Sequence, residues 1–247
     1  MRWHRNFGSV LSLLLLFVGC AAQKPALDAE SLQMRYHQAI LDAQVAEPKE
    51  ISTNLTAITP TNNKLIWQTF DSTSYLAVVT WTSWNGYDDR VGESLMLQRE
   101  VWVTVVPELR DFCQNIDTGG IGVDLRLEQL LGLPPQNGKT KFIELWVKPE
   151  DLFRPAPDPE ISDFEAELDF PVSERFIKID PAHKTWFNQL KSSSYGADGY
   201  PWTRLGYTYD WGNPKSEIGL SEFVIRAGAQ VRIASVTPTT AYCRASN

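Results

Sequence analysis

The sequence predicts an α+β domain, built on a mainly antiparallel β-sheet with a few short helices and an N-terminal helix. Two observations carry this prediction. From Lys64 onward, short segments rich in β-branched and aromatic residues alternate with turn-forming segments. A few short stretches between them have helical character instead, and we find no internal repeat.

The N-terminal helix is expected from Asp28 to about Ala46. Asp28 is a good N-cap residue, and Glu47-Pro48 ends the helical pattern. The apolar residues that fall on one face at helical spacing are Leu32, Tyr36, Ala39, Ile40 and Ala43. We expect this face to pack on the domain; an arm that docks a partner protein is the alternative.

Strands are expected over residues 65–70, 75–84, 97–106, 142–147, 223–226 and 230–236. Short helices are expected over residues 107–114, 124–131 and 180–191. The turn-like residues 85–94 predict a long hairpin between the strands on either side. Ala227-Gly228-Ala229 predicts a second hairpin, formed by the last two strands.

The first twenty residues have the pattern of an export signal. Arg2 and Arg5 give a positive start, and the apolar run over residues 11–18 is too short to cross a bilayer as a helix. The ending Phe17-Val18-Gly19-Cys20 resembles the lipobox of bacterial lipoprotein precursors, although Phe17 stands where that family usually has Leu. The resemblance implies cleavage before Cys20 and lipid attachment to that cysteine. An ordinary signal peptide cut near Ala21-Ala22 is the alternative.

The lipoprotein resemblance also implies a location and a division of the chain. In that family an Asp after the lipidated cysteine favours the inner membrane; here Ala21 follows, which implies the outer membrane, facing the periplasm, if the cell has one. Residues 1–19 are then the signal peptide. Residues 20–63 hold the lipidated cysteine, a spacer, the helix and a linker, and residues 64–247 form a single α+β domain.

The two remaining cysteines, Cys113 and Cys243, form an even pair in an exported chain, which predicts one disulfide. Two separate buried thiols are the alternative. The chain has no CxxC motif and no Cys/His cluster, which argues against structural zinc and thioredoxin chemistry.

The acidic composition argues against nucleic acid as a partner, because a formal net charge of −7 gives no general attraction to phosphates. The loop over residues 132–140 has a superficial likeness to a phosphate-binding loop. Five residues separate its glycines instead of four, and two prolines remove backbone N–H donors. We therefore expect no nucleotide and assign no cofactor.

No catalytic or metal site is assigned from the sequence. GxSxG and HExxH motifs are absent, and we expect His183 to be exposed to solvent and not part of a triad with the nearby residues 192–194. The acidic residues 156–169 are expected to form a solvated loop. A calcium site is the alternative there, but the run lacks the EF-hand order.

The block over residues 200–212 combines aromatic residues with glycine, proline and two charges, and it is the candidate recognition surface for a sugar or a protein. Its candidate binding residues are Trp202, Arg204, Tyr207, Tyr209 and Trp211. Packing of an irregular segment on the sheet is the alternative.

Together these observations predict a lipid-anchored cell-envelope protein with a binding or structural role. It would attach to the membrane through its anchor and recognise another envelope protein or a cell-wall glycan. A glycan-directed envelope hydrolase that uses Asp or Glu as acid and base is the alternative.

Overall fold

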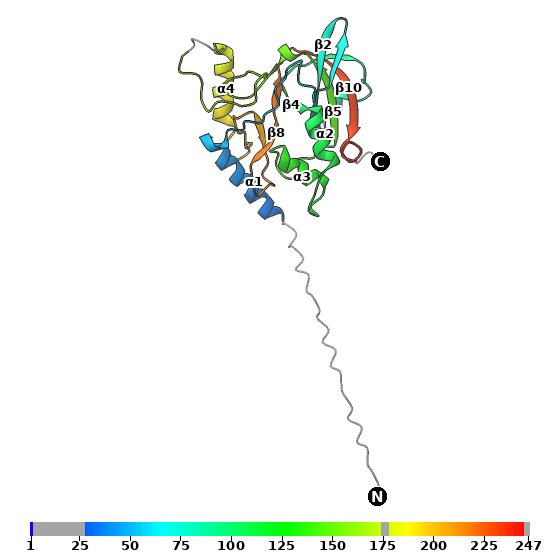
Figure 1. Cartoon of the computed structure of the whole chain (residues 1–247), viewed down its shortest axis with the longest axis vertical. Coiled ribbons are helices and arrows are strands. Elements are labelled where there is room, and N and C mark those ends of the chain that lie inside the picture. The colour runs from blue at the N-terminus through cyan, green and yellow to red at the C-terminus, as the bar shows by residue number, and fades with distance from the viewer. Residues whose placement is uncertain (2–27, 174–177, 245–247) are drawn as a thin grey trace.

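The computed structural model describes residues 28–173 and 178–244, together with Met1. The predicted signal peptide, its cleavage site and Cys20 lie outside the described residues. Within them the α+β prediction is confirmed: a mainly antiparallel sheet of eight strands carries short helices (Figure 1).

The helices are α1 (Ala29–Ala43), α2 (Val106–Gln114), α3 (Val123–Leu130), α4 (Pro181–Ser193) and α5 (Thr239–Tyr242), with 3₁₀ turns at Pro48–Glu50, Asn85–Tyr87 and Pro149–Asp151. The strands are β1 (Trp67–Phe70), β2 (Thr73–Thr82), β3 (Ser94–Met96), β4 (Val101–Val105), β5 (Lys141–Val147), β6 (Leu152–Phe153), β7 (Tyr207–Tyr209), β8 (Ile218–Ser221), β9 (Phe223–Ile225) and β10 (Gln230–Pro238). Asp28, the predicted cap, accepts a backbone N–H at the start of α1, and Asp180, the first residue of the helix expected over residues 180–191, does the same at the start of α4.

The main sheet has the order β3-β10-β5-β2-β4-β9-β6, with β1 paired to β2, while β7 and β8 form a separate pair. As predicted, the strands on either side of residues 85–94 are antiparallel neighbours, but β2 and β4 share only the pairs Val78↔Val105 and Val79↔Thr104. The strand expected over residues 97–106 is shorter than predicted and covers only Val101–Val105, while residues 94–96 just before it form β3, which pairs with β10.

The predicted hairpin of β9 with β10 is wrong. Ala229 N–H donates to Arg226 C=O in the expected turn, yet β9 pairs with β4 and β6 while β10 pairs with β5 and β3. A β-turn brings its ends within about 7 Å. Four strand spacings in a flat sheet would separate them by roughly 19 Å. The sheet therefore curves so that β9 and β10, each next to an end strand, approach one another at this turn.

The curved sheet has two differently packed faces. Alternate residues such as Leu76 and Val78 join the main core, where they meet Phe223 of β9 and Val231 of β10. The intervening residues Ala77, Val79 and Trp81 face α2, α3 and α5 and form the second core. Figure 1 shows α2 and α3 beside the sheet, with α1 and α4 on the side away from β10.

Two attachments hold the ends of the described chain on the domain. α1 buries the predicted face, with Tyr36 edge-on to Trp211, and the following segment is integrated through Leu55, Ala57 and Ile58, which are buried. At the other end, Cys113 of α2 is disulfide-bonded to Cys243, as predicted. Among the described residues, no helix has both the length and the apolar character needed to cross a membrane.

Candidate ligand-binding cavity

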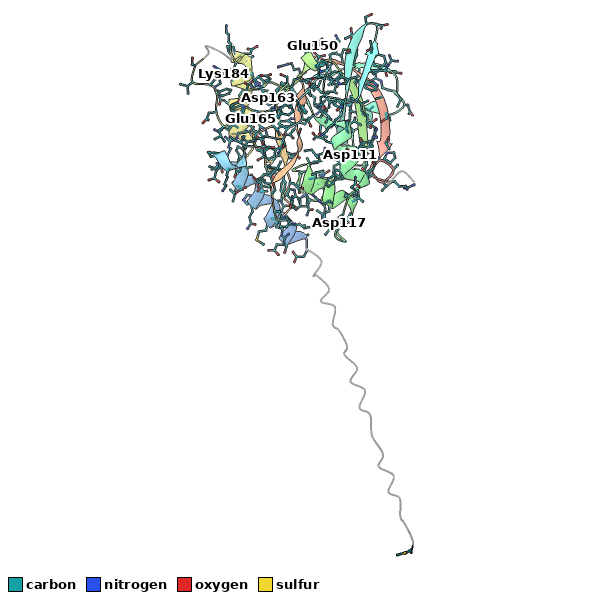
Figure 2. All side chains as sticks on the ribbon, viewed as in Figure 1. Asp111, Asp117, Glu150, Asp163, Glu165 and Lys184 are labelled. Atoms are coloured by element: carbon teal, nitrogen blue, oxygen red, sulfur yellow. A yellow bond between two sulfur atoms is a disulfide. The ribbon has the colours of Figure 1, made fainter. Side chains whose placement is uncertain are left out.

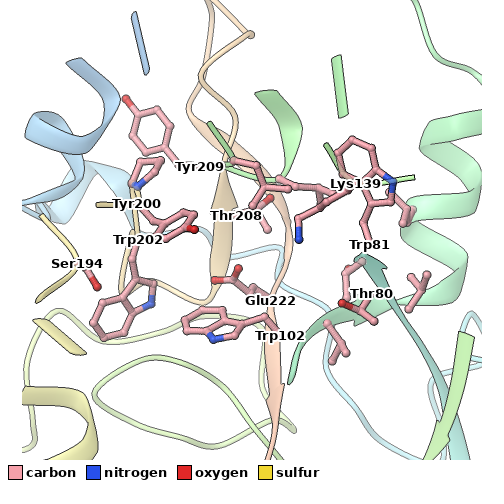
Figure 3. Close-up of a pocket in the computed structure, with 18 of the residues that line it drawn as sticks. Thr80, Trp81, Trp102, Lys139, Ser194, Tyr200, Trp202, Thr208, Tyr209 and Glu222 are labelled. Atoms are coloured by element: carbon pink, nitrogen blue, oxygen red, sulfur yellow. The ribbon is translucent and has the colours of Figure 1, made fainter. Parts of the chain in front are cut away.

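A cavity of about 430 Å³ opens between the helix-facing side of the sheet and the segment that follows α4. We name it the Glu222 cavity (Figure 3). Its walls are mainly apolar and aromatic, formed among others by Val79, Trp81, Trp102, Leu109, Leu131, Leu133, Leu190, Trp202 and Tyr209. This volume and character are typical of small-molecule sites, which are usually concave and apolar with a few polar groups.

The sheet forms one side of the cavity, and strand alternation determines which of its residues face it. Val79 of β2 is paired with Thr104 of β4, so both point to the same face. On the other side of β4, the pair Val103↔Phe223 ends the ladder, and Glu222 is the residue before Phe223. Glu222 thus stands beside Thr104 at the end of β9, and its carboxyl group points into the cavity (Figure 3).

Glu222 is an acid without a partner. No hydrogen bond or ion pair joins its carboxyl group to the described part of the chain. Burial alone raises its pKa to about 8 from an ordinary value of 4.5. At neutral pH the group is therefore mainly a carboxylic acid, with one O–H to donate and a carbonyl oxygen to accept.

Lys139 enters the cavity from the loop after α3. Buried Glu128 fixes this loop by accepting the Asn137 backbone N–H at 2.9 Å, and Asn137 Oδ1 in turn accepts the Lys139 N–H at 3.0 Å. The Lys139 ammonium group points into the cavity (Figure 3), and no carboxylate of the described residues pairs with it. Burial lowers its pKa.

Thr104 is the third polar group without a partner. Its residue is only 4% exposed, and its hydroxyl has no hydrogen bond within the described ranges. An unsatisfied buried hydroxyl costs about 1–3 kcal/mol, so a ligand that bonds to it recovers that cost. By contrast, the hydroxyls of Thr208 and Ser194 are already used, donating to Leu130 C=O and Leu190 C=O respectively.

Aromatic packing makes one wall of the cavity rigid. Trp102 and Trp202 meet edge to face with ring centroids 6.3 Å apart. Trp186 of α4 contacts both rings from behind, and Trp202 donates its indole N–H to Pro155 C=O. The two tryptophans are therefore held in place before any ligand arrives.

The five candidate binding residues from the sequence are divided between two places. Trp202 and Tyr209 line the Glu222 cavity. Arg204 donates to the C=O groups of Ala43 and Gln44 at the end of α1, and Tyr207 donates to Glu50 C=O. Trp211 packs on Tyr36 and donates to Leu133 C=O. Their role in binding remains a prediction, now attached to the cavity through Trp202 and Tyr209.

Glu222, Lys139 and Thr104 were not predicted from the sequence. Lys139 was considered only in the loop rejected as a phosphate site. Glu222 is a charged residue directly before a buried strand, and Thr104 lies inside one. A polar residue in or next to a buried strand is the only signal of the site in the sequence. It points to a cavity only when the pairing of β4 with β2 and β9 is known.

His183 is not exposed, which corrects the expectation from the sequence. It is 4% exposed, packs against Phe153 and Trp186, and its Nε2 lies 2.8 Å from Ala156 C=O. Burial lowers its pKa. The first turn of α4 carries the residue inward. The nearby hydroxyls of Ser192 and Ser194 donate to backbone of their own helix.

The acidic segment is organised by an arginine. Arg154, which is 1% exposed, forms an ion pair with Asp163 and donates to Glu165 C=O at 2.6 Å. Figure 2 labels Asp163 and Glu165 close together, consistent with their shared partner. Within the described ranges, no group of three or more His, Cys, Asp or Glu residues is placed to hold a metal ion.

Comparisons with protein-family models, with curated proteins and with solved structures found no match for this chain. The class of protein therefore has to be argued from the cavity itself. Among its described lining residues, Glu222 is the only acid, whereas hydrolysis of a glycosidic bond ordinarily uses two carboxyl groups.

Proposed function

We propose that the protein is a lipid-anchored ligand-binding protein of the cell envelope, and that the Glu222 cavity holds one small, largely apolar molecule. The observation that carries the proposal is the cavity's combination of a rigid tryptophan wall with polar groups that have no partner among the described residues. A core that served only packing would have filled this volume or paired these groups.

The membrane anchor is the second part of the proposal and rests on residues 17–20. Attachment at Cys20 would place the domain at a membrane surface, where its ligand or partner is an envelope component. An envelope protein that delivers or receives the ligand would dock nearby.

Occupancy of the cavity is tested with N-phenyl-1-naphthylamine, a neutral aromatic probe that becomes fluorescent in apolar surroundings. We expect saturable binding of one probe per protein. Leu133→Trp should weaken it by at least about tenfold, because the partly exposed Leu133 lines the cavity and an indole there would occupy the probe's space.

The control for this experiment is Val91→Trp, which adds the same ring at a residue 57% exposed outside the cavity. It should leave probe binding unchanged. Equal binding by the Leu133→Trp variant and the unmodified protein would refute the cavity as the binding site.

The anchor is tested by the intact mass of protein extracted from membranes. We expect a chain that begins at Cys20 and carries acyl groups, with Cys113 and Cys243 protected from alkylation until a reductant is added. Cys20→Ser should abolish the acylated species. A wild-type mass without lipid would remove the anchor from the proposal and leave the cavity untouched.

A further inference from the structure

We propose that the ligand of the Glu222 cavity is an amphipathic organic anion whose charged group pairs with Lys139 and whose body carries a hydrogen-bond acceptor for Glu222 and Thr104. This inference rests on the proposed function and names the chemical class of its ligand. It follows from three properties of the cavity.

The first property is an ammonium group in a partly buried, mainly apolar site. Lys139 is the only cation among the described lining residues, and it has no carboxylate partner there. A neutral ligand that closed the cavity would bury this charge without compensation, whereas an anion would pair with it. An organic cation would be repelled by it.

The second property is that the one acid in the cavity does not cancel this charge at neutral pH. The carboxyl group of Glu222 is held mainly protonated by burial, with no contribution to its pKa from Lys139. It therefore donates a hydrogen bond and does not repel an anion. Thr104, its neighbour on the adjacent strand β4, supplies a second unused hydroxyl donor to the same region.

The third property is an aromatic wall across the cavity from Lys139. In Figure 3 the Lys139 side chain enters from the loop after α3 and Glu222 enters from the sheet with Trp102 beside it, while Trp202 and Tyr200 lie on the other side of the cavity. A ligand with an apolar ring body and one acidic substituent satisfies both walls together. A cavity of about 430 Å³ limits it to a small molecule and excludes a long polymer.

The other titratable groups near the cavity are accounted for. The lining residues from β2, β4, α2 and α4 carry no titratable group. Besides Lys139 and Glu222, the titratable groups of the lining are the phenols of Tyr200 and Tyr209. Burial raises the pKa of Tyr209 further above neutrality. Two carboxyls on adjacent elements are already bonded: Glu108 of α2 accepts the Ser221 N–H, and Glu144 of β5 pairs with Arg110.

The test uses two probes that share one ring system and differ by a single sulfonate group. 8-Anilinonaphthalene-1-sulfonate is an anion with the same ring system as the neutral N-phenyl-1-naphthylamine. We expect the sulfonate to bind the unmodified protein more tightly, and Lys139→Met to weaken the sulfonate by about tenfold while changing the neutral probe less than about twofold. Lys139→Gln provides a second neutral replacement if the methionine variant unfolds.

Lys141→Met is the matched control. It removes the same charge two residues away, but Lys141 pairs with Asp88 at 2.6 Å and does not line the cavity. Sulfonate affinity should stay within about twofold of wild type. Thermal unfolding of each variant checks that the anionic probe reports the cavity and not loosened structure, to which it also binds.

The pH dependence provides a second readout. As pH rises past about 8, Glu222 ionises and becomes an anion inside the site, so sulfonate binding should fall while neutral-probe binding changes less. Loss of the proton from Lys139, whose pKa burial lowers, adds to the fall at higher pH in every variant that keeps this lysine. Glu222→Gln keeps a donor and cannot ionise, so it should flatten this part of the profile. The sulfonate itself stays ionised throughout this range.

The outcomes separate the inference from the proposed function. If Lys139→Met affects both probes equally or neither, and Leu133→Trp still blocks the neutral probe, the anion inference is wrong and the cavity remains a binding site. If Leu133→Trp blocks neither probe, the proposed site itself fails. The inference is supported if Lys139→Met weakens binding of the sulfonate but not of the neutral probe, and if Glu222→Gln flattens the pH profile.

Discussion

Replacement of both disulfide cysteines, as Cys113→Ala with Cys243→Ala, is expected to lower the free energy of unfolding by about 4 to 5 kcal/mol. The bond joins two residues that are 130 positions apart in sequence, so it closes a long loop of the domain. In the chain-entropy model its main effect is on the unfolded chain, whose conformations it restricts.

The disulfide also fixes the last helix against the sheet. Around it, Trp81 donates its indole N–H to the Thr239 hydroxyl at 2.8 Å, and Tyr242 packs on Phe142. These contacts remain in the variant, so we expect the native fold to persist with reduced stability. Urea unfolding of the oxidised protein, the reduced protein and the double variant measures the effect. A difference below about 1 kcal/mol would contradict it.

Asp210→Ala is expected to destabilise the protein by about 3 to 5 kcal/mol, the cost of breaking a buried ion pair from one side. Asp210 accepts hydrogen bonds from both terminal nitrogens of Arg126, at 2.9 and 2.6 Å, and the Asp210 side chain is 3% exposed. It also accepts the Gly212 N–H at 3.1 Å. The substitution leaves a partly buried guanidinium and a backbone donor without a partner.

Two further variants isolate the charge from the lost volume. Arg126→Met with Asp210→Leu removes both charges and should recover much of the stability, because apolar pairs often replace buried ion pairs without loss. Glu93→Gln breaks the exposed Arg90–Glu93 pair and should change stability by less than about 1 kcal/mol. An Asp210→Ala effect as small as that of Glu93→Gln would show that the buried pair contributes little.

The local structure of this chain could largely be predicted from its sequence. β-Branched and aromatic composition identified the segments that became β2 and β5, Asp28 marked the start of α1, and the helix expected over residues 180–191 became α4, because these signals lie within a few neighbouring residues. The N-terminal region lies outside the described residues, so the lipidation of Cys20 stays a prediction.

Partners across the sheet could not be predicted in the same way. Ala227-Gly228-Ala229 does form a turn, but a turn signal does not tell which strands pair after it. His183 was misjudged because its burial depends on Phe153, a residue of β6 that is distant in sequence. The cavity depended on the same information, since Glu222 meets Thr104 only through the pairing of β4 with β9.

The turn between β9 and β10 affects how the chain acquires its structure. β10 pairs with both β3 and β5, so the sheet is incomplete until the chain is available as far as Pro238. Pairings between such distant segments make folding slow, because the entropy of closing a long loop is lost before the stabilising contacts form. A chain threaded through a membrane from its N-terminus would thus stay unfolded during passage and fold as one unit on the far side.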